Sequence, residues 1–219
     1  MLTAFVNSKG GVGKSTLAVH FAVWLYDRGA KVGLIDCDKQ CSSSAWIAEA
    51  EPRISVETAA TPEELALKAR ALAQSCDFVV GDGPAGLDEM SRTLLILADL
   101  AIFPIGPSIL DLRSVAGAVA LLKFAQTING GLPEGKLVLN KTRLRDRISR
   151  ELEATAPTLS LRVAGVSVRE LQAFRECIQQ GTVVTRMENC AVDAANDVIQ
   201  LFEELTAHLN QSPLKASNS

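Results

Sequence analysis

Short apolar runs rich in β-branched residues alternate along the chain with longer segments in which apolar residues recur every three or four positions. The short runs are apolar at most successive positions, which is typical of strands covered on both faces of a sheet. They predict strands at Thr3–Val6, Lys31–Asp36, Asp77–Asp82, Leu100–Ile105 and Lys136–Asn140, with a weaker one at Leu161–Val166. The alternation of strands with helical segments predicts an α/β fold with a doubly wound, mostly parallel sheet.

The longer segments are predicted to be helices because their apolar residues follow a helical period. They lie at Lys14–Asp27, Pro62–Gln74, Leu112–Thr127, Arg147–Ala154, Arg169–Gln179 and Val192–Leu209. The chain has 219 residues, of which 47% are apolar, and this is enough for one compact core. We therefore expect a single domain over residues 1–210 and a disordered polar tail over residues 211–219.

Charge and composition narrow the class of protein. Charged residues make up 21% of the chain and the net charge is −3, so any contact with nucleic acid must come from a local patch. The longest apolar stretch, Leu94–Ile105, is interrupted by Asp99 and is shorter than the roughly 20 residues that span a bilayer. The N-terminus lacks the features of a secretory signal, and the five cysteines show no C-x-x-C spacing. We expect a cytoplasmic protein with reduced thiols and no membrane contact.

A glycine-rich segment between the first predicted strand and the first predicted helix carries the strongest chemical signal. Its sequence is Ser8-Lys9-Gly10-Gly11-Val12-Gly13-Lys14-Ser15-Thr16, in the context that a phosphate-binding loop requires. The glycines let backbone N–H groups curl around a phosphate chain, and the following helix points its positive end at the same anion. Lys14 would neutralise the terminal phosphates, Ser15 would place a hydroxyl on Mg²⁺, and Thr16 would reach another phosphate oxygen. The alternative is a glycine-rich turn without a ligand.

The loop departs from the ordinary phosphate-loop pattern at its start. Ser8 stands where glycine is usual, and Lys9 adds a second lysine. The segment Lys9–Ser15 resembles the deviant Walker A signature of the ParA/MinD family of ATPases, and the likeness extends from Thr3 to about Leu209. The resemblance implies a P-loop NTPase that binds ATP and Mg²⁺ through this loop and dimerises around two nucleotides. It also implies that Lys9 acts on the phosphates bound by the partner copy, much as an arginine finger does.

Two further segments are similar to the switches of this family. Asp36-Cys37-Asp38-Lys39-Gln40 is similar to its D-x-D-P-Q segment, with Lys39 in place of proline. The resemblance implies that Asp38 positions the attacking water and that Asp36 supports the Mg²⁺ shell, although both carboxylates could instead cap the next turn. The strand that ends at Asp82 looks like a Walker B element, in which that carboxylate holds the metal through water.

Asn140 ends the strand Lys136–Asn140 and matches the family position whose side-chain amide reads the edge of adenine. The alternative is an asparagine that satisfies a turn. The ten residues that follow, 141–150, carry a net charge of +4. Such a cluster could bind DNA backbone phosphates without reading sequence, or it could be a solvated helix face. The candidate DNA contacts are Arg143, Arg145, Arg147 and Arg150.

The resemblance thus implies a small ParA-like partition ATPase that lacks an N-terminal helix-turn-helix. Such a protein forms a homodimer with ATP, coats nonspecific DNA on the nucleoid and hydrolyses ATP slowly to drive DNA segregation. Its partner would be a centromere-binding ParB-type protein or a cargo adaptor that stimulates hydrolysis. One rival is the same ATPase positioning a protein cargo on the nucleoid, and another is a metabolic P-loop phosphotransferase. Membrane binding of the MinD kind is disfavoured, because the C-terminal region carries Glu203 and Glu204 and only Lys215 as a basic residue.

Overall fold

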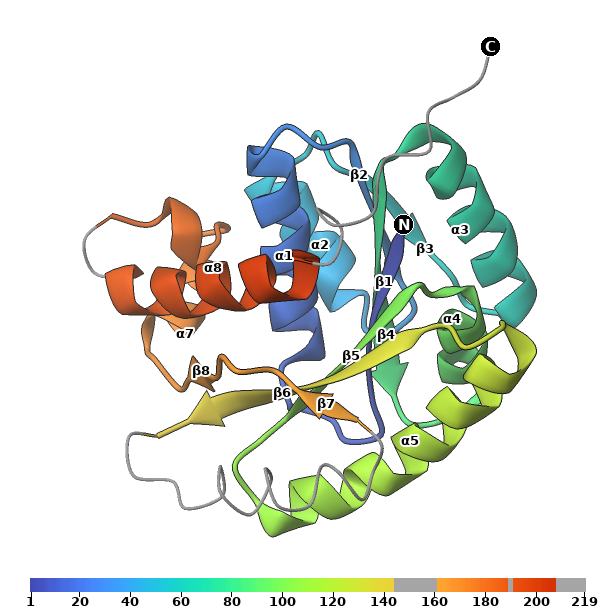
Figure 1. Ribbon diagram of the computed structural model, residues 1–219. Coiled ribbons are helices and arrows are strands. Elements are labelled where there is room, and N and C mark those ends of the chain that lie inside the picture. The colour runs from blue at the N-terminus through green and yellow to red at the C-terminus, as the bar shows by residue number, and fades with distance from the viewer. Residues whose placement is uncertain (144–160, 189–190, 208–219) are drawn as a thin grey trace.

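The computed structural model describes residues 1–143, 161–188 and 191–207. Within these residues, eight strands form a parallel sheet (Figure 1). Seven follow the order β3-β2-β4-β1-β5-β6-β7, and β8 pairs with β6 farther along that strand than β7 does. Helices cover both faces of the sheet, so the prediction of a doubly wound α/β fold is confirmed. Among the described residues, no helix is both long and apolar enough to cross a membrane.

The five main predicted strands are all present, with small differences at their ends. They are β1 (Leu2–Asn7), β2 (Val32–Asp36), β4 (Phe78–Ala85), β5 (Leu100–Ile105) and β6 (Glu134–Thr142). The weaker strand is replaced by two short ones, β7 (Arg162–Val163) and β8 (Val168–Arg169). The edge strand β3 (Ser55–Thr58) was not predicted, because three of its four residues are polar, none is buried, and the segment gives no apolar run.

The predicted helices are present where the structure describes them. These are α1 (Lys14–Asp27), α3 (Pro62–Ser75), α5 (Ile109–Ile128), α7 (Ala173–Gln179) and α8 (Val192–Thr206). The helix predicted from Arg169 begins four residues later, because Arg169 belongs to β8. Two short helices, α2 (Ser42–Ala50) and α4 (Glu89–Leu97), and the 3₁₀ turn η1 (Val184–Arg186) were not predicted. The predicted helix Arg147–Ala154 lies outside the described residues.

Two apolar clusters hold the helices on the sheet. One lies under α1, α2, α7 and α8, and the other under α3, α4 and α5. In the first cluster the ring of Phe21 on α1 packs edge-on against Phe5 of β1, with 5.9 Å between centroids, and against Phe202 of α8, with 5.1 Å. Each fully buried aromatic side chain contributes roughly 2–3 kcal/mol through burial. Helix α1 is thus anchored on both sides, which gives the glycine-rich loop before it a rigid base.

The register of the parallel strands brings three chain segments to one edge of the sheet. Asp36 of β2 is level with Asp82 of β4, and Asp82 is level with Phe5 of β1. The carboxyl ends of these strands therefore lie side by side, with the glycine-rich loop directly after β1. In a doubly wound sheet this edge is where ligands bind.

Candidate functional site

The glycine-rich loop occupies residues 8–13, between β1 and α1. Gly11 and Gly13 have φ angles of 75° and 96°, which L side chains rarely adopt. Asn7 fastens the start of the loop: its side-chain amide donates to the Pro104 carbonyl at 2.6 Å and accepts from the Lys9 backbone N–H at 3.0 Å. Sequence reasoning missed Asn7, because nothing local shows that β5 lies beside β1.

Lys14 is buried at the first position of α1, and its Nζ donates to the Lys9 carbonyl at 3.2 Å. Burial lowers the pKa of its ammonium group, while the negative charges of Asp82 and Asp38 oppose that shift. No carboxylate of the described residues forms a salt bridge with Lys14. The structure therefore places a cation at a helix N-terminus, where it would complement an anion.

Asp82, in the C-terminal half of β4, is completely buried, and its two carboxylate oxygens accept no well-formed hydrogen bond from the described residues. Burial raises its pKa to about 7, although the nearby hydroxyls of Ser15 and Ser43 and the charge of Lys14 act in the opposite direction. Leaving a buried polar group unpaired costs about 1–3 kcal/mol, and more when the group is charged. Carboxylate and hydroxyl oxygens are the ligands that Mg²⁺ prefers, so these residues fit the expected metal.

Asp36 and Asp38 follow at the end of β2. Both oxygens of Asp36 accept backbone N–H groups, one from Asp38 at 3.0 Å and one from Ser44 at 2.9 Å. Asp38 accepts from the N–H of Gln40 at 2.9 Å and remains partly exposed. The structure thus realises the turn-capping alternative for Asp36 while keeping it beside Asp82, whose pKa its charge raises. Asp38 lines a cavity of about 580 Å³ between the segments that follow β2 and β4.

Asn140, on β6, lies directly against the glycine-rich loop. Its amide nitrogen donates to the Val12 carbonyl at 2.7 Å, and a Cβ at Gly13 would collide with it. Because a carbonyl only accepts, this bond fixes the orientation of the amide and leaves Oδ1 available as an acceptor. Asn140 and Thr16 line a cavity of about 140 Å³, whose other walls include Phe174 and Ile178 of α7.

Two lysines lie at the outer side of the loop. Lys9 is exposed, and the Nζ of Lys141 donates to the Gly11 carbonyl at 2.6 Å. Both line a cavity of about 420 Å³ together with Arg143 and Glu170. Lys9 therefore lies on the open side of the site. The family resemblance implies that it contacts a second copy there.

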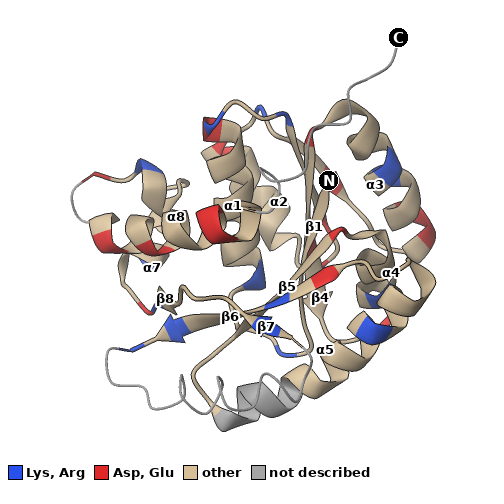
Figure 2. Cartoon of the chain, in the orientation of Figure 1, with Lys and Arg blue, Asp and Glu red and all other residues tan. Residues whose placement is uncertain are grey.

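Of the four arginines predicted to contact DNA, only Arg143 is among the residues that the structure describes. Arg143 pairs with Glu170 at 2.9 Å, and Glu170 also pairs with Arg175 at 3.2 Å. Arg145, Arg147 and Arg150 lie outside the described residues. Basic residues mark β6 and its end, whereas α8 carries mainly acidic ones (Figure 2).

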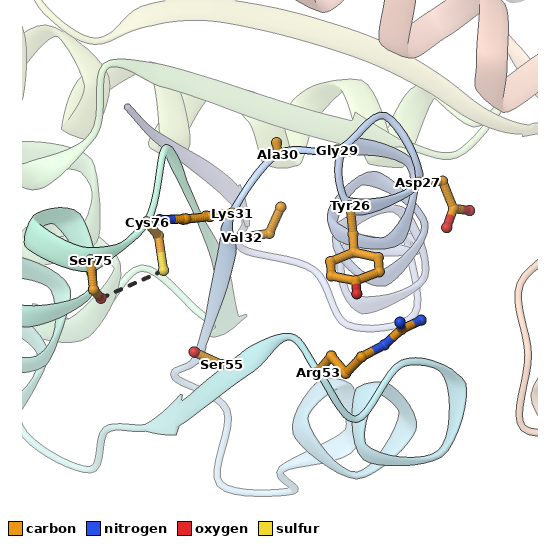
Figure 3. A pocket seen from close by; sticks show the side chains of 10 residues that line it. All are labelled: Tyr26, Asp27, Gly29, Ala30, Lys31, Val32, Arg53, Ser55, Ser75 and Cys76. Atoms are coloured by element: carbon orange, nitrogen blue, oxygen red, sulfur yellow. Dashed lines mark hydrogen bonds between the residues drawn. The ribbon is translucent and has the colours of Figure 1, made fainter.

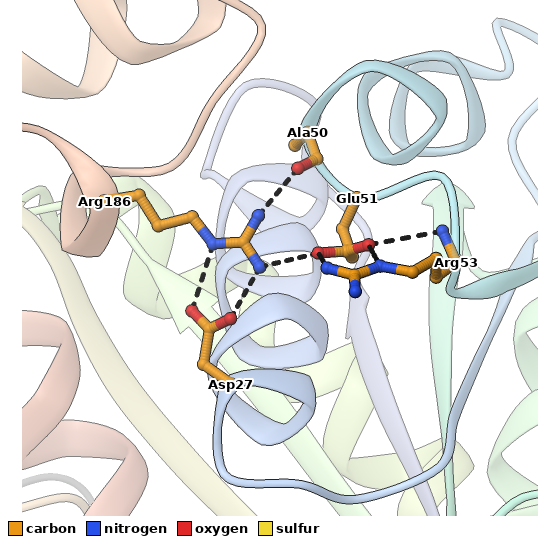
Figure 4. Close-up of polar contacts among 5 residues, drawn as sticks. All are labelled: Asp27, Ala50, Glu51, Arg53 and Arg186. Atoms are coloured by element: carbon orange, nitrogen blue, oxygen red, sulfur yellow. Dashed lines mark hydrogen bonds and ion pairs between the residues drawn. The ribbon is translucent and has the colours of Figure 1, made fainter.

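The largest group of paired charges anchors α2, which the sequence did not predict. Arg186 of η1 binds Asp27, the last residue of α1, and Glu51, which follows α2 (Figure 4). It also donates to the Ala50 carbonyl at 2.7 Å. Trp46 of α2 donates its indole N–H to the Thr182 carbonyl at 2.9 Å. These contacts set the position of α2, and with it the position of Ser43 beside Asp82.

Another cavity, of about 570 Å³, lies at the opposite edge of the sheet (Figure 3). Its lining includes Val32 and Ser55, the first residues of β2 and β3, and Cys76, which precedes β4. This cavity therefore lies where the parallel strands begin, whereas the glycine-rich loop lies where they end, after the last residue of β1. The cavity does not belong to the same site. The described cysteines, Cys37, Cys41, Cys76 and Cys177, are free thiols.

Comparisons with known proteins agree on one family. The family model described as "CobQ/CobB/MinD/ParA nucleotide binding domain" matches residues 3–184. Maintenance of carboxysome distribution protein A from Halothiobacillus neapolitanus is 32% identical over 209 residues, which are 92% of this chain and 94% of that protein. A Cyanothece McdA variant in complex with ATP superposes with a TM-score of 0.74 at 16% identity, over 97% of both chains. MinD from Pyrococcus horikoshii with Mg-ADP gives 0.72 at 21% identity, over 97% of this chain and 99% of that one.

Proposed function

Because the chain belongs to the CobQ/CobB/MinD/ParA family of nucleotide-binding domains and is a ParA/MinD-like P-loop NTPase, we propose that it is an Mg²⁺-dependent ATPase that positions a protein cargo. The observation that carries the nucleotide site is the meeting of a buried cation, Lys14, with a buried unpaired carboxylate, Asp82, beside the glycine-rich loop. The protein-cargo function is favoured by the 32% identity to a carboxysome distribution protein over nearly the whole chain.

Each predicted site residue has a role in this proposal. The loop from Lys9 to Thr16 wraps the phosphates through its backbone, and Lys14 neutralises the terminal ones. When bound, Mg²⁺ supplies charge stabilisation to the phosphates, with Ser15 as a direct ligand and Asp36 and Asp82 holding its waters. Asp38 orients the attacking water from the partly exposed turn after β2.

The base of the nucleotide is selected by Asn140. One of its two amide N–H groups is committed to the Val12 carbonyl, so Oδ1 and the second N–H remain for the base. This acceptor and donor match the amino group and the neighbouring ring nitrogen of adenine, whereas guanine presents two acceptors, O6 and N7, on the corresponding edge. We expect ATP to be preferred over GTP for this reason.

In the proposed cycle, ATP closes two copies face to face, with Lys9 of each acting on the other's nucleotide. The closed dimer coats nonspecific DNA on the nucleoid through arginines at and after the end of β6. A cargo adaptor stimulates hydrolysis and releases the dimer. ATP shifts the monomer–dimer equilibrium only through contacts that exist in the dimer, and Lys9 supplies such a contact.

Light scattering of purified variants with Mg-ATP tests the switch. We expect the wild type and Asp38→Ala to dimerise, with Asp38→Ala remaining dimeric for longer because hydrolysis is blocked. Lys14→Ala should lose nucleotide binding, and Lys9→Ala should bind ATP as a monomer. Lys31→Ala, at the opposite edge of the sheet, is the control and should behave as the wild type. Normal dimerisation of Lys9→Ala would contradict the proposed role of Lys9.

A second experiment separates the candidate functions. Positioning ATPases should bind arbitrary duplex DNA more tightly with ATP than with ADP, and binding should weaken steeply with salt. Equal weak binding in both nucleotide states would favour a metabolic phosphotransferase. Deletion of the gene should disperse or cluster a protein assembly while replicons are retained, whereas loss of a plasmid or chromosome would favour DNA segregation.

A further inference from the structure

Three consecutive serines at the start of α2 have three different environments. Ser42 is exposed, and the Ser44 hydroxyl donates to the Cys41 carbonyl at 2.8 Å. Ser43 is completely buried, and its hydroxyl makes no well-formed hydrogen bond with the described residues. A buried hydroxyl without a partner is costly, and an alanine would avoid that cost. The presence of a serine therefore needs an explanation.

The surroundings of Ser43 point to Asp82. The Ser43 hydroxyl lies close enough to the Asp82 carboxylate to oppose the rise of its pKa, as the Ser15 hydroxyl does. Yet both oxygens of Asp82 also lack a well-formed hydrogen bond with the described residues. Two buried side chains without a well-formed hydrogen bond thus lie close together inside the protein, near the hydroxyl of Ser15 that is expected to bind the metal.

The position of Ser43 is set by the backbone around it. Asp36 accepts the N–H of Ser44, and Cys41 adopts a left-handed φ of 50° immediately before the helix. These features fix the first turn of α2 beside the end of β2. The far end of α2 is held by Arg186, so the helix cannot rotate freely to expose Ser43.

We propose that Ser43 is a positioning residue for Mg²⁺: its hydroxyl donates to Asp82 and orients that carboxylate toward the waters of the metal held at Ser15. An ionised carboxylate only accepts hydrogen bonds, so the hydroxyl of Ser43 is a suitable donor. Groups that orient the ligands of a metal in this way raise its affinity without touching it. This inference rests on the proposed function, and it adds a residue that neither the phosphate loop nor the Walker B pattern includes.

The test compares Ser43→Ala and Ser43→Cys with Ser42→Ala, the exposed neighbour, as the matched control. The complex of each variant with AMPPNP is titrated with Mn²⁺ and followed by electron paramagnetic resonance. We expect Mn²⁺ affinity to fall about 10-fold or more in both Ser43 variants, because loss of such supporting groups costs about 10–100-fold. Cysteine has the shape of serine with a somewhat larger terminal atom, but its thiol is a weak donor, so it should not restore binding.

Two further results decide the interpretation. Affinity for AMPPNP without metal should be the same in all variants, which would show that the nucleotide site itself is intact. If Mn²⁺ affinity in both Ser43 variants stays within about twofold of the wild type, the role of Ser43 is overturned. If the wild type binds no AMPPNP at all, the proposed function fails instead.

Discussion

The edge of the sheet that carries the glycine-rich loop and the cluster around Arg186 bury charge in opposite ways. In the Arg186 cluster, defined by Asp27, Glu51, Arg53 and Arg186, each carboxylate faces at least one guanidinium (Figure 4). At the loop edge, Asp82 is completely buried and accepts no well-formed hydrogen bond from the described residues. Buried polar groups in proteins are almost always paired, so the exception marks the place that a ligand completes.

The pKa values of the two buried carboxylates make the contrast concrete. Hydrogen bonds from Arg53 and Arg186 lower the pKa of Glu51 to about 2, although its side chain is only 3% exposed. Burial raises the pKa of Asp82 to about 7, since the compensating groups around it are weaker. The first carboxylate stabilises the fold as an anion, whereas the second is destabilising as an anion until a cation arrives.

Replacing Arg186 should have the largest effect on stability. Arg186→Met leaves Glu51 and Asp27 without their shared guanidinium, and breaking a buried pair costs about 3 kcal/mol of unfolding free energy. Urea unfolding of the ligand-free protein measures this change. Arg175→Met is the control, because Arg175 is 75% exposed and Arg186 only 27%, so its loss should cost about 0.5 kcal/mol or less. Equal losses for both variants would remove the distinction drawn for the Arg186 cluster.

His20 should control the loss of stability in mild acid. It is buried on α1, where Nδ1 bonds the Thr16 carbonyl at 2.7 Å and Nε2 accepts the Val184 N–H at 3.1 Å. Burial lowers its pKa from 6.5 to about 4, so folding favours the neutral ring. Its contribution is complete above pH 6.5 and is lost as pH falls toward 4, by about 3 kcal/mol in total.

Urea unfolding between pH 7 and pH 4 checks this, with His20→Gln as the comparison. The variant is expected to be less stable at pH 7 but to lose less stability on acidification. Parallel pH profiles for the two proteins would show that His20 does not titrate as inferred. The buried His20 ring has its hydrogen bonds satisfied, like the carboxylates of the Arg186 cluster. Protonation of Nε2 would remove the acceptor that binds the Val184 N–H.

Replacing Asp82 should have a smaller effect of the opposite sign. Asp82→Asn removes a buried unpaired charge, so the ligand-free protein should gain about 1 kcal/mol at pH 8. Because the folded-state pKa of about 7 exceeds the usual 3.8, wild-type stability from this group is present below pH 3.8 and lost as pH rises through 7. The gain should therefore grow between those values and then level off.

Thermal unfolding without Mg-ATP measures the stability of the ligand-free protein, and thermal unfolding with Mg-ATP measures how much the ligand stabilises it. The wild type should be stabilised by Mg-ATP, whereas Asp82→Asn should lose most of that shift. If ligand-free Asp82→Asn is instead less stable than the wild type, Asp82 stabilises the fold as Glu51 does. The contrast between the two regions would then disappear.

Strong local patterns predicted much of the fold. The five main strands and α1 are apolar over enough residues to be recognised, and the glycine-rich loop between β1 and α1 led to the family that the comparisons confirm. The elements that were missed, α2, α4 and β3, are short and polar at many positions, and tertiary contacts such as the Trp46 bond to Thr182 hold α2 in place. Weak local preference is overridden by such contacts.

The sequence by itself determined the order strand, glycine loop, helix, because those features depend on residues adjacent in the chain. It also placed Lys14, Ser15 and Asp82 in recognisable local patterns. Only the tertiary structure decided that Ser43 lies near Asp82, that Asn140 donates an N–H to the Val12 carbonyl, and that Arg186 pairs with Glu51. The members of these pairs lie 39, 128 and 135 positions apart in the chain. In addition, Ser43 belongs to α2, a helix that no local pattern predicted. Strand order and helix packing bring them together, and neither is encoded in the spacing of neighbouring residues.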